Sequence, residues 1–433
     1  MRLERQTCRA AIYISPGKAI TSMSAPLRRS SPLLIVFLCV LIDMLGYSMI
    51  VPLLPFIVHE QSESALMVGM LSALYALMQL LAAPVLGALS DRIGRRPVLI
   101  GSLLASSGAY ALLGIAGMVG SLPLIGLAVA WGGAAGASIP TVQAYISDRC
   151  KPCERTRSLG LVGAAFGIGL MVGPAAGGLL SVYGLNVPAL AAGLLALLNT
   201  LFALFMLPES LPLERRMRRS LSPLSIAGQI GYAVALPNLR PLLLAVFLLN
   251  LAFAGLQSNF PIFSSERFGW DPLNNGVFFA FVGFCGVFTQ AFLVGRLLPR
   301  FGEPLLIVGG LSLMSLSLSL TALAAKAWML FPLIGLMALG LGLALPSLTS
   351  LIAGGAGEGR QGAALGGMQA LLSLALIFGP PLAGMLFDLY GPSAPYLSGS
   401  FLTAGSLAAA VFGLWAVLRQ GRPKCPLHVD QQP

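Results

Sequence analysis

The sequence predicts an all-α integral membrane protein, with twelve transmembrane helices in two parallel six-helix repeats. Three observations support this fold class. Of the 433 residues, 57% are hydrophobic and 9% are charged, whereas an ordinary soluble domain carries about 25% charged residues. The apolar residues fall in long runs such as 33–58 and 305–325, and a run of about 20 apolar residues crosses a bilayer as one helix. Several short motifs also recur at a nearly constant offset along the chain.

Counting the apolar runs in order gives twelve predicted spans. They cover residues 33–58, 66–90, 98–118, 121–144, 159–182, 187–207, 240–263, 275–298, 305–325, 328–352, 362–388 and 393–418. The 51 glycines and 30 prolines agree with this assignment, because in a membrane they allow close helix contacts and kinks.

The basic residues are distributed unevenly about these spans. When both termini are placed on one side, that side holds all of the 26 Lys and Arg residues except Arg267 and Lys326. Positive charge collects in cytoplasmic loops, so we expect a protein of the plasma membrane, in bacteria the inner membrane, with both termini cytoplasmic. The net charge of +11 is then a topology signal and a contact for membrane lipid. No basic patch interleaved with aromatic residues indicates nucleic acid.

Motifs that recur 206 to 208 residues apart divide the chain into two halves. The pattern Gly-x-x-x-Asp-Arg-x-Gly at 87–94 returns as Gly-x-x-x-Pro-Arg-x-Gly at 295–302, and Gly-Pro-x-x-Gly-Gly at 173–178 returns as Gly-Pro-x-x-Ala-Gly at 379–384. A repeat of six spans keeps the same orientation in the membrane. The halves are therefore predicted to be parallel repeats, with a substrate site between them near the midplane.

These repeats and the polar segments around them define five predicted units. They are a cytoplasmic N-terminal tail (1–32), an N-terminal six-helix half (33–207), a cytoplasmic linker with Arg215, Arg216, Arg218 and Arg219 (208–239), a C-terminal six-helix half (240–418) and a cytoplasmic C-terminal tail (419–433). The composition of the first unit leaves open whether Met1 or Met23 is the natural start.

The loop after the second predicted span carries a family signature. It reads Gly87-Ala-Leu-Ser-Asp91-Arg92-Ile-Gly94-Arg95-Arg96, which resembles the loop signature of the major facilitator superfamily. Gly94 allows a tight turn, and Asp91 is expected near the positive end of the following helix. A short inner loop also attracts arginine for topology alone. The resemblance implies that this gating loop latches the cytoplasmic ends of the two halves and breaks and reforms during transport.

The fifth predicted span carries a second signature. Its residues Gly160, Gly169, Gly173, Pro174, Gly177 and Gly178 match the antiporter signature of the same superfamily. Three of these glycines are four residues apart and share one helix face, where a neighbouring backbone can approach closely, and the proline bends the helix. Helix packing alone accounts for part of the pattern, and the resemblance favours export over import.

Longer stretches of the chain are similar to the tetracycline exporters among the drug and proton antiporters. The similar stretches are residues 71–103, residues 163–178 and the sequence Glu266-Arg-Phe-Gly-Trp270. The resemblance extends over nearly all of 33–418. It implies a twelve-span antiporter that exchanges a drug-like compound for protons.

One carboxylate, Asp43, lies deep inside a predicted span. An ionisable group at that depth costs at least about 2.5 kcal/mol and is a functional candidate by default. A carboxyl group that holds either a proton or a cationic substrate supplies the competition that an antiporter needs. Tyr47 lies one helical turn further on, on the same face. A structural acid paired with a neighbour is the alternative, although no basic residue lies deep inside a predicted span to pair with it.

The chain departs from the tetracycline exporters at four intramembrane positions. By visual alignment, Ala109, Val129, Gly286 and Met314 stand where those exporters carry an acid, an arginine, a histidine and a second acid. Loss of these groups removes charge that should help to bind a cationic metal complex of tetracycline. We therefore expect tetracycline to be a poor substrate and neutral or singly charged amphipathic compounds to be better ones.

Other polar side chains inside the spans suit hydrogen bonding to such a compound. The candidates for lining a cavity are Tyr47, Tyr75, Gln79, Gln143, Asn250, Gln257, Asn259, Gln290 and Gln369. For each of them a hydrogen bond between helices is the competing explanation.

The sequence contains no indication of an enzyme. His59 and His428 are the two histidines, one in an outer loop and one in the tail, which excludes a His-dependent triad or a His metal site in the membrane. No GxxxxGK[ST] loop occurs, so we expect ion gradients rather than ATP as the energy source. We expect no cofactor and no metal, and the partners are a small-molecule substrate, protons and membrane lipid.

The leading hypothesis is a proton-coupled exporter of small amphipathic compounds. Two alternatives remain open at this point: a facilitator or symporter of an endogenous metabolite, and a transport-inactive interaction protein on the same fold. The oligomeric state is also open, and a monomer is compatible with the sequence.

Overall fold

The computed structural model describes residues 32–62, 64–150, 155–216, 231, 239–356 and 361–419, and these residues form helices and turns with no β-strand. The predicted tails, apart from residue 32 and residue 419 at their inner ends, fall outside the described residues, as do Met23, Arg218 and Arg219. The all-helical fold class predicted from the sequence is confirmed.

The described residues of the first half form eight α-helices. They are α2 (Pro32–Ile50), α3 (Leu54–His59), α4 (Ala65–Ile93), α5 (Arg95–Val119), α6 (Leu122–Ala135), α7 (Ile139–Arg149), α8 (Arg155–Ser181) and α9 (Val187–Met206). Two predicted spans are thus broken into two helices each, the first at residues 51–53 and the fourth at residues 136–138. Both breaks lie beside a proline, Pro52 or Pro140, whose ring nitrogen cannot donate the next helical hydrogen bond.

The second half contains longer and less interrupted helices. They are α11 (Arg240–Phe268), α12 (Pro272–Phe288), the π-helix η2 (Thr289–Leu293), α13 (Val294–Ala322), α14 (Leu330–Gly355), α15 (Gln361–Tyr390) and α16 (Ala394–Arg419). Short 3-10 turns, η1 (Leu213–Arg215) and η3 (Ala327–Met329), lie in the connections.

Eleven helical stretches of the described chain are long and apolar enough to span a membrane. One of them, Pro272–Ala322, has 51 residues and would be about 77 Å long if straight, which is more than twice the thickness of the hydrocarbon core. The chain reverses inside it at Gly302, where φ is 72°. This stretch therefore holds the eighth and ninth predicted spans, and the twelve-span count follows.

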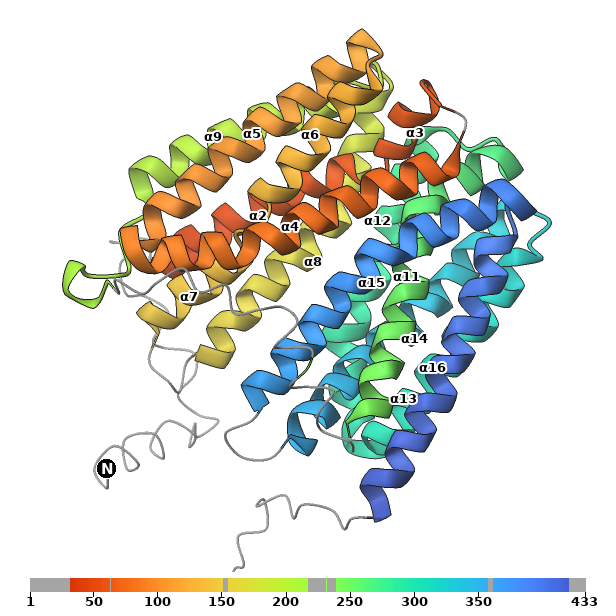
Figure 1. Ribbon diagram of the computed structural model, residues 1–433. Coiled ribbons are helices and arrows are strands. Elements are labelled where there is room, and N and C mark those ends of the chain that lie inside the picture. The colour runs from red at the N-terminus through yellow and green to blue at the C-terminus, as the bar shows by residue number, and fades with distance from the viewer. Residues whose placement is uncertain are drawn as a thin grey trace, which may run out of the picture.

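The two halves meet mainly along two pairs of helices, α4 with α15 and α8 with α12, and α11 makes a smaller contact with α3 and α4. For orientation we name two ends of the bundle: the Gly94 face, with the α4–α5 turn at Gly94, and the Ser64 face, with the turn between α3 and α4. Figure 1 shows the two groups of helices close together near α3 and farther apart toward α7 and the start of α15. The bundle therefore has the form of a V that is closed at the Ser64 face.

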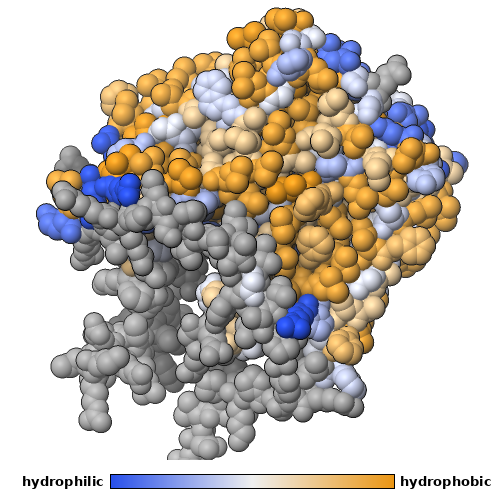
Figure 2. Space-filling model, in the orientation of Figure 1, coloured by the Kyte–Doolittle hydropathy of each residue, from blue (hydrophilic) through white to orange (hydrophobic). Residues whose placement is uncertain are grey.

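The lateral surface of the bundle is apolar. Large side chains such as Phe205, Phe401 and Phe412 are 77%, 79% and 60% exposed, and Figure 2 shows hydrophobic residues over much of the face in view. A soluble monomer rarely exposes so much contiguous apolar surface. Lipid tails can cover this surface, in agreement with an integral membrane protein.

Candidate functional site

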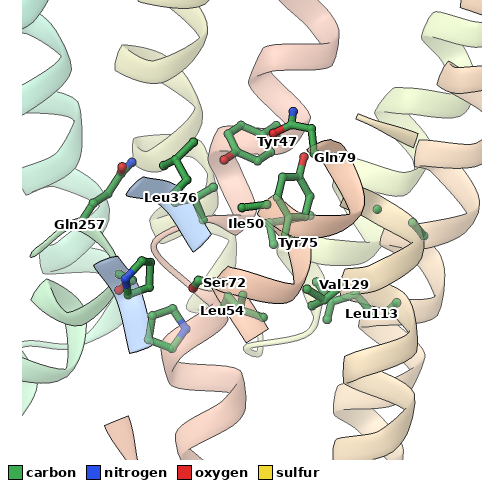
Figure 3. A pocket seen from close by; sticks show the side chains of 18 of the residues that line it. Tyr47, Ile50, Leu54, Ser72, Tyr75, Gln79, Leu113, Val129, Gln257 and Leu376 are labelled. Carbon is green, nitrogen blue, oxygen red and sulfur yellow. The ribbon is translucent and has the colours of Figure 1, made fainter. Parts of the chain in front are cut away.

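A cavity lies between the two halves. It is lined by α2 to α6 of the first half and by α11 and α15 of the second half (Figure 3). Its volume, counted as the space open to the centres of water molecules, is about 140 Å³, roughly ten times what one water molecule needs. The polar lining residues are Tyr47, Ser72, Tyr75, Gln79, Tyr110, Gln257 and Ser258, and the other lining residues are apolar, so that no charged side chain is among them.

Three polar side chains of the cavity, Tyr47, Tyr75 and Gln79, lie together on one side. The Tyr47 and Tyr75 ring centroids are 5.6 Å apart, and Figure 3 places Gln79 beside them and Gln257 across the cavity. Gln79 Nε2 donates a hydrogen bond of 3.3 Å to the carbonyl of Gly136. The Tyr75 hydroxyl lies only 2.6 Å from the place where a Cβ on Gly136 would be. The break between α6 and α7 thus makes the space in which this tyrosine is held.

Asp43 does not line this cavity. It lines a second, smaller cavity of about 30 Å³, still more than the roughly 10–15 Å³ that one water molecule needs. Ser138, from the break between α6 and α7, is the other hydrogen-bonding side chain there, and the remaining lining residues are Val36, Cys39, Val40, Leu99, Leu103, Val142 and Leu207. Among the described residues no ion pair involves Asp43. The carboxyl group is therefore separate from the main cavity, although it is one helical turn from Tyr47 on α2.

The other sequence candidates lie outside the main cavity. Asn250 Nδ2 donates to the Val246 carbonyl over 2.9 Å, and Asn259 Nδ2 donates to the Gly255 carbonyl over 3.0 Å. Each amide therefore bonds to its own helix one turn back. The remaining candidates, Gln143, Gln290 and Gln369, are exposed.

Several lining residues were not among the sequence candidates. Tyr110, Ser72 and Ser258 line the main cavity. Tyr110 could have been predicted to line a cavity, because it is a tyrosine in the middle of an apolar span. The two serines could not, because serine is common in membrane helices. Two of the positions at which the chain departs from the tetracycline exporters, Ala109 and Val129, also line the cavity.

The glycines of the fifth span pack α8 against α2. A Cβ on Gly169 would lie 2.6 Å from Met44 Cβ, and one on Gly173 or Gly177 would meet Ser48 or the carbonyl of Met49. Ser48 Oγ also donates to the Gly169 carbonyl over 2.7 Å. These three glycines share the face that touches α2. Gly160 is exposed, with no atom within 4 Å of its would-be Cβ.

The same motif also builds both contacts between the halves. In the α8–α12 contact a Cβ on Gly276 would meet the carbonyl of Pro174, and one on Gly178 would meet the backbone of Gly276. In the α4–α15 contact a Cβ on Gly69 would meet the carbonyl of Pro380. Pro174 and Pro380 are 206 residues apart, which is the repeat offset. The two contacts at the Ser64 face are thus equivalent parts of the two repeats.

The halves separate toward the Gly94 face. Four glycines lie at the ends of α4, α8, α12 and α13 that point toward the Gly94 face. A Cβ added to any of them would have no atom within 4 Å except the neighbouring backbone of its own helix. These glycines are Gly87, Gly160, Gly286 and Gly295. The main cavity adjoins the α4–α15 contact: Pro380 belongs to both, and the cavity continues along α4 through Ser72, Tyr75 and Gln79. The structure is a conformation that is closed at the Ser64 face.

A network of charged groups surrounds the turn at Gly94. Gly94 has φ 112°. The Arg95 guanidinium pairs with Asp91 at 2.6 Å and with Asp148 at 3.2 Å. Its backbone N–H, however, donates to Glu209 over 3.0 Å. Glu209 therefore accepts from the N–H groups at the N-terminus of α5, and Asp91 pairs with the side chain of the first residue of that helix.

The other arginines of this loop extend the network along the Gly94 face. Arg96 donates from its guanidinium to the Leu204 carbonyl over 2.6 Å, Arg149 donates to the Glu209 carbonyl, and Arg92 is exposed. The partners of Arg95, Arg96 and Glu209 in the described chain belong to the first half and to the start of the linker, and none belongs to the second half. In this conformation the network braces one half, and the latch between halves stays a prediction.

Comparisons with known proteins agree with this geometry. The chain is 36% identical over 367 residues to the tetracycline resistance protein, class C, of Escherichia coli, covering 83% of this chain and 91% of the relative. It is 28% identical over 397 residues to multidrug resistance protein 2 of Bacillus subtilis (strain 168), covering 88% and 93%.

Solved structures share the fold. The human organic anion transporter MFSD10 (TETRAN) superposes with a TM-score of 0.66 at 24% identity, over 87% of this chain and 98% of that one. A mutant of the nucleoside transporter NupG superposes with a TM-score of 0.73 at 11% identity, over 89% and 99%. The family model of the major facilitator superfamily matches residues 36–324 and 287–432. With paired halves, a cavity between them and this match over almost the whole chain, the protein belongs to the major facilitator superfamily of transporters, which are not enzymes.

Proposed function

We propose that the protein exports small amphipathic compounds, neutral or singly charged, in exchange for protons. The observation that carries this proposal is the cavity between the halves. Its walls are apolar, with a few tyrosine, glutamine and serine side chains and no charged lining residue. Such a site gains from burying apolar area and orients a ligand by hydrogen bonds. A multiply charged ligand would lose hydration there without an opposite charge to replace it.

The relatives narrow the class of substrate. Their names refer to tetracycline resistance and multidrug resistance, and both point to export of drug-like compounds. The positions Ala109 and Val129 make the cavity wall apolar where we infer charged groups in the tetracycline exporters. A broad set of lipophilic substrates therefore suits this cavity better than the metal complex of tetracycline.

The proposal assigns proton coupling to Asp43. Because its cavity is separate from the substrate cavity, proton and substrate do not compete for one group. Both cavities are lined by α2, and both touch the break between α6 and α7, through Ser138 on one side and the Tyr75–Gly136 contact on the other. Binding of a proton at Asp43 therefore affects the substrate cavity, and binding of a substrate affects the Asp43 cavity, through the positions of these helices.

The orientation in the membrane follows from the charges. The Gly94 face carries the arginines at positions 92, 95, 96, 149 and 216, and basic loops remain in the cytoplasm. We therefore place the Gly94 face and both termini in the cytoplasm, so that the conformation described is inward-facing. Reporter fusions at each terminus test this; a reporter that is active only outside the cytoplasm should stay silent at both.

The function is tested in inside-out membrane vesicles energised by an imposed proton gradient. Adding ethidium should release protons from vesicles with the wild-type protein, with uptake of the dye. Asp43→Asn keeps the shape of the side chain and removes its titration, so we expect dye uptake against a gradient to fall to background while dye binding persists. Glu303→Gln, at the Gly94 face, is the control for a lost carboxylate elsewhere and should behave as wild type.

The other outcomes identify the alternatives. Dye movement down its gradient without proton release would indicate a facilitator. Neither binding nor movement of any compound in a lipophilic panel would indicate an interaction protein. Unchanged uptake against a gradient in Asp43→Asn would overturn the coupling role of Asp43.

A further inference from the structure

The C-terminal end of α15 makes a polar contact across the two halves. The Asp388 carboxylate accepts hydrogen bonds from Ser64 Oγ over 2.6 Å, from the Ala65 backbone N–H over 2.8 Å and from the Leu66 backbone N–H over 3.0 Å. The last two groups are the first N–H groups of α4. A residue of the second half thus caps a helix of the first half.

The position of Asp388 is unfavourable for its own helix. It lies in the last turn of α15, which ends at Tyr390, and a negative charge there faces the negative end of the helix dipole. The N-terminus of α4, by contrast, offers unbonded N–H groups and the positive end of a dipole. The charge is therefore stabilised by α4 and destabilised by α15, and it favours the arrangement that brings the two helix ends together.

The equivalent contact in the other repeat has no such cap. The N-terminus of α12 is capped within its own half by Asp271, which accepts from the Asn274 N–H over 2.7 Å. One repeat offset before Asp388 stands Val182, which cannot accept a hydrogen bond from its side chain. Among the described residues, a cap across the halves therefore forms between α15 and α4 and not between α8 and α12.

The helix α4 can also keep a cap when the halves part. Ser64 is its N-cap residue, and its hydroxyl accepts from the Met67 N–H over 3.4 Å. In the closed arrangement this hydroxyl donates to Asp388. Loss of Asp388 therefore leaves α4 with the serine cap alone, and serine is one of the preferred N-cap residues.

We propose that Asp388 is a gating residue: it holds the Ser64 face closed by capping α4 from the opposite half, and its release opens that face. The inference rests on the proposed transport cycle, because a gate has meaning only in a protein that alternates between faces. It adds to that cycle a residue that touches neither the substrate cavity nor Asp43.

The test measures the opening of the Ser64 face in the absence of substrate and of a proton gradient. Spin labels at Met118→Cys and Leu323→Cys, in a background without other cysteines, report the distance between the halves, because both side chains are exposed at helix ends of that face, 60% and 72%. We expect Asp388→Ala to raise the ratio of open to closed distances roughly two- to thirty-fold, the effect of losing one helix cap. Asp388→Asn keeps one accepting oxygen and loses the negative charge, so it should raise the ratio by a smaller factor.

Asp271→Asn is the matched control. It alters an exposed aspartate that caps a helix N-terminus on the same face, but within one half. We expect it to leave the open-to-closed ratio unchanged. If Asp388→Asn and Asp388→Ala gave the wild-type ratio, or if Asp271→Asn raised the ratio equally, the gating role would be overturned. Because the readout involves no transported compound, the spin-label distances can be interpreted even if the export proposal fails. The export experiment can likewise be interpreted if the gating proposal fails.

Discussion

The two contacts between the halves are built from the same repeated motif and differ in what borders them. In the α8–α12 contact, close backbone packing continues along the helices, since a Cβ on Gly283 would lie 2.8 Å from Met171 Cα. The α4–α15 contact borders the main cavity, with Tyr75 and Leu376 on the cavity wall, and Asp388 caps α4 across the halves. The first contact therefore lies away from the cavity, and the second lies beside it.

This difference separates two mechanical roles. A contact that stays packed over several turns resists separation, because each small residue along it would have to leave a close-fitting neighbour. A contact that borders a cavity and is held by hydrogen bonds at its end can open when those bonds are lost. We therefore expect the α8–α12 contact to act as a pivot and the α4–α15 contact to act as a gate. The residues that line the main cavity include members of α4 and α15 and none of α8 or α12.

The largest effect is expected from adding a side chain to each contact. Gly283→Val places a branched side chain against the backbone of α8, and overpacking of this kind costs about 1–3 kcal/mol. Gly69→Val does the same against Pro380 and Pro381, but the gate can relieve the clash by opening. We expect Gly283→Val to lower the melting temperature in detergent without opening the Ser64 face, and Gly69→Val to open that face with a smaller loss of stability.

The control for both is Gly309→Val on α13, where no atom lies within 4 Å of the added carbon. It carries the same change in helix propensity, and its melting temperature should stay near wild type. Equal opening in Gly69→Val and Gly283→Val would remove the distinction between gate and pivot.

A second, smaller effect compares the same turn in the two repeats. Gly94 and Gly302 have φ values of 112° and 72° and ψ values of 158° and 165°. Residues other than glycine are strained there by about 1–3 kcal/mol. A Cβ on Gly94 would also meet the Glu209 carboxylate and the Arg216 guanidinium, whereas one on Gly302 has Pro304 Cδ at 3.7 Å. We expect Gly94→Ala to lower the melting temperature more than Gly302→Ala. The opposite order would contradict the bracing role of the Glu209 network.

The sequence predicts the course of the chain better than its sites. Apolar runs and the repeat offset are properties of long segments, so they determine the spans and their pairing. The breaks at 51–53 and 136–138 are not predictable in this way, because membrane helices tolerate proline: Pro84, Pro174 and Pro346 lie inside unbroken helices. Whether a proline breaks a helix depends on which neighbours satisfy the freed backbone groups.

The sites are only partly predictable for a similar reason. Tyr47, Tyr75, Gln79 and Gln257 line the cavity as the polar positions suggest, but Asn250 bonds to its own helix, and nothing in the local sequence distinguishes the two cases. Asp43 is conspicuous because it lies mid-span, yet its separation from the cavity depends on how α5 and α7 pack. Asp388 lies at a span end, where acids are common. Its signal was a negative charge in the last turn of a helix.

The smallest effect is expected from the carboxylate at the other end of α4. Asp91 is half exposed, and its partner Arg95 also holds Asp148 and the Ser90 hydroxyl. Loss of one partly exposed ion pair costs less than about 1 kcal/mol. We expect Asp91→Asn to leave the melting temperature and the spin-label distances near wild type, because the Gly94 face is open in this conformation. The effect of Asp91→Asn should appear only when that face closes. We expect slower transport of ethidium across the membrane with an unchanged dissociation constant for ethidium. A weaker affinity for ethidium in detergent, matching the loss of rate, would show that Asp91 acts on the cavity and not as a latch.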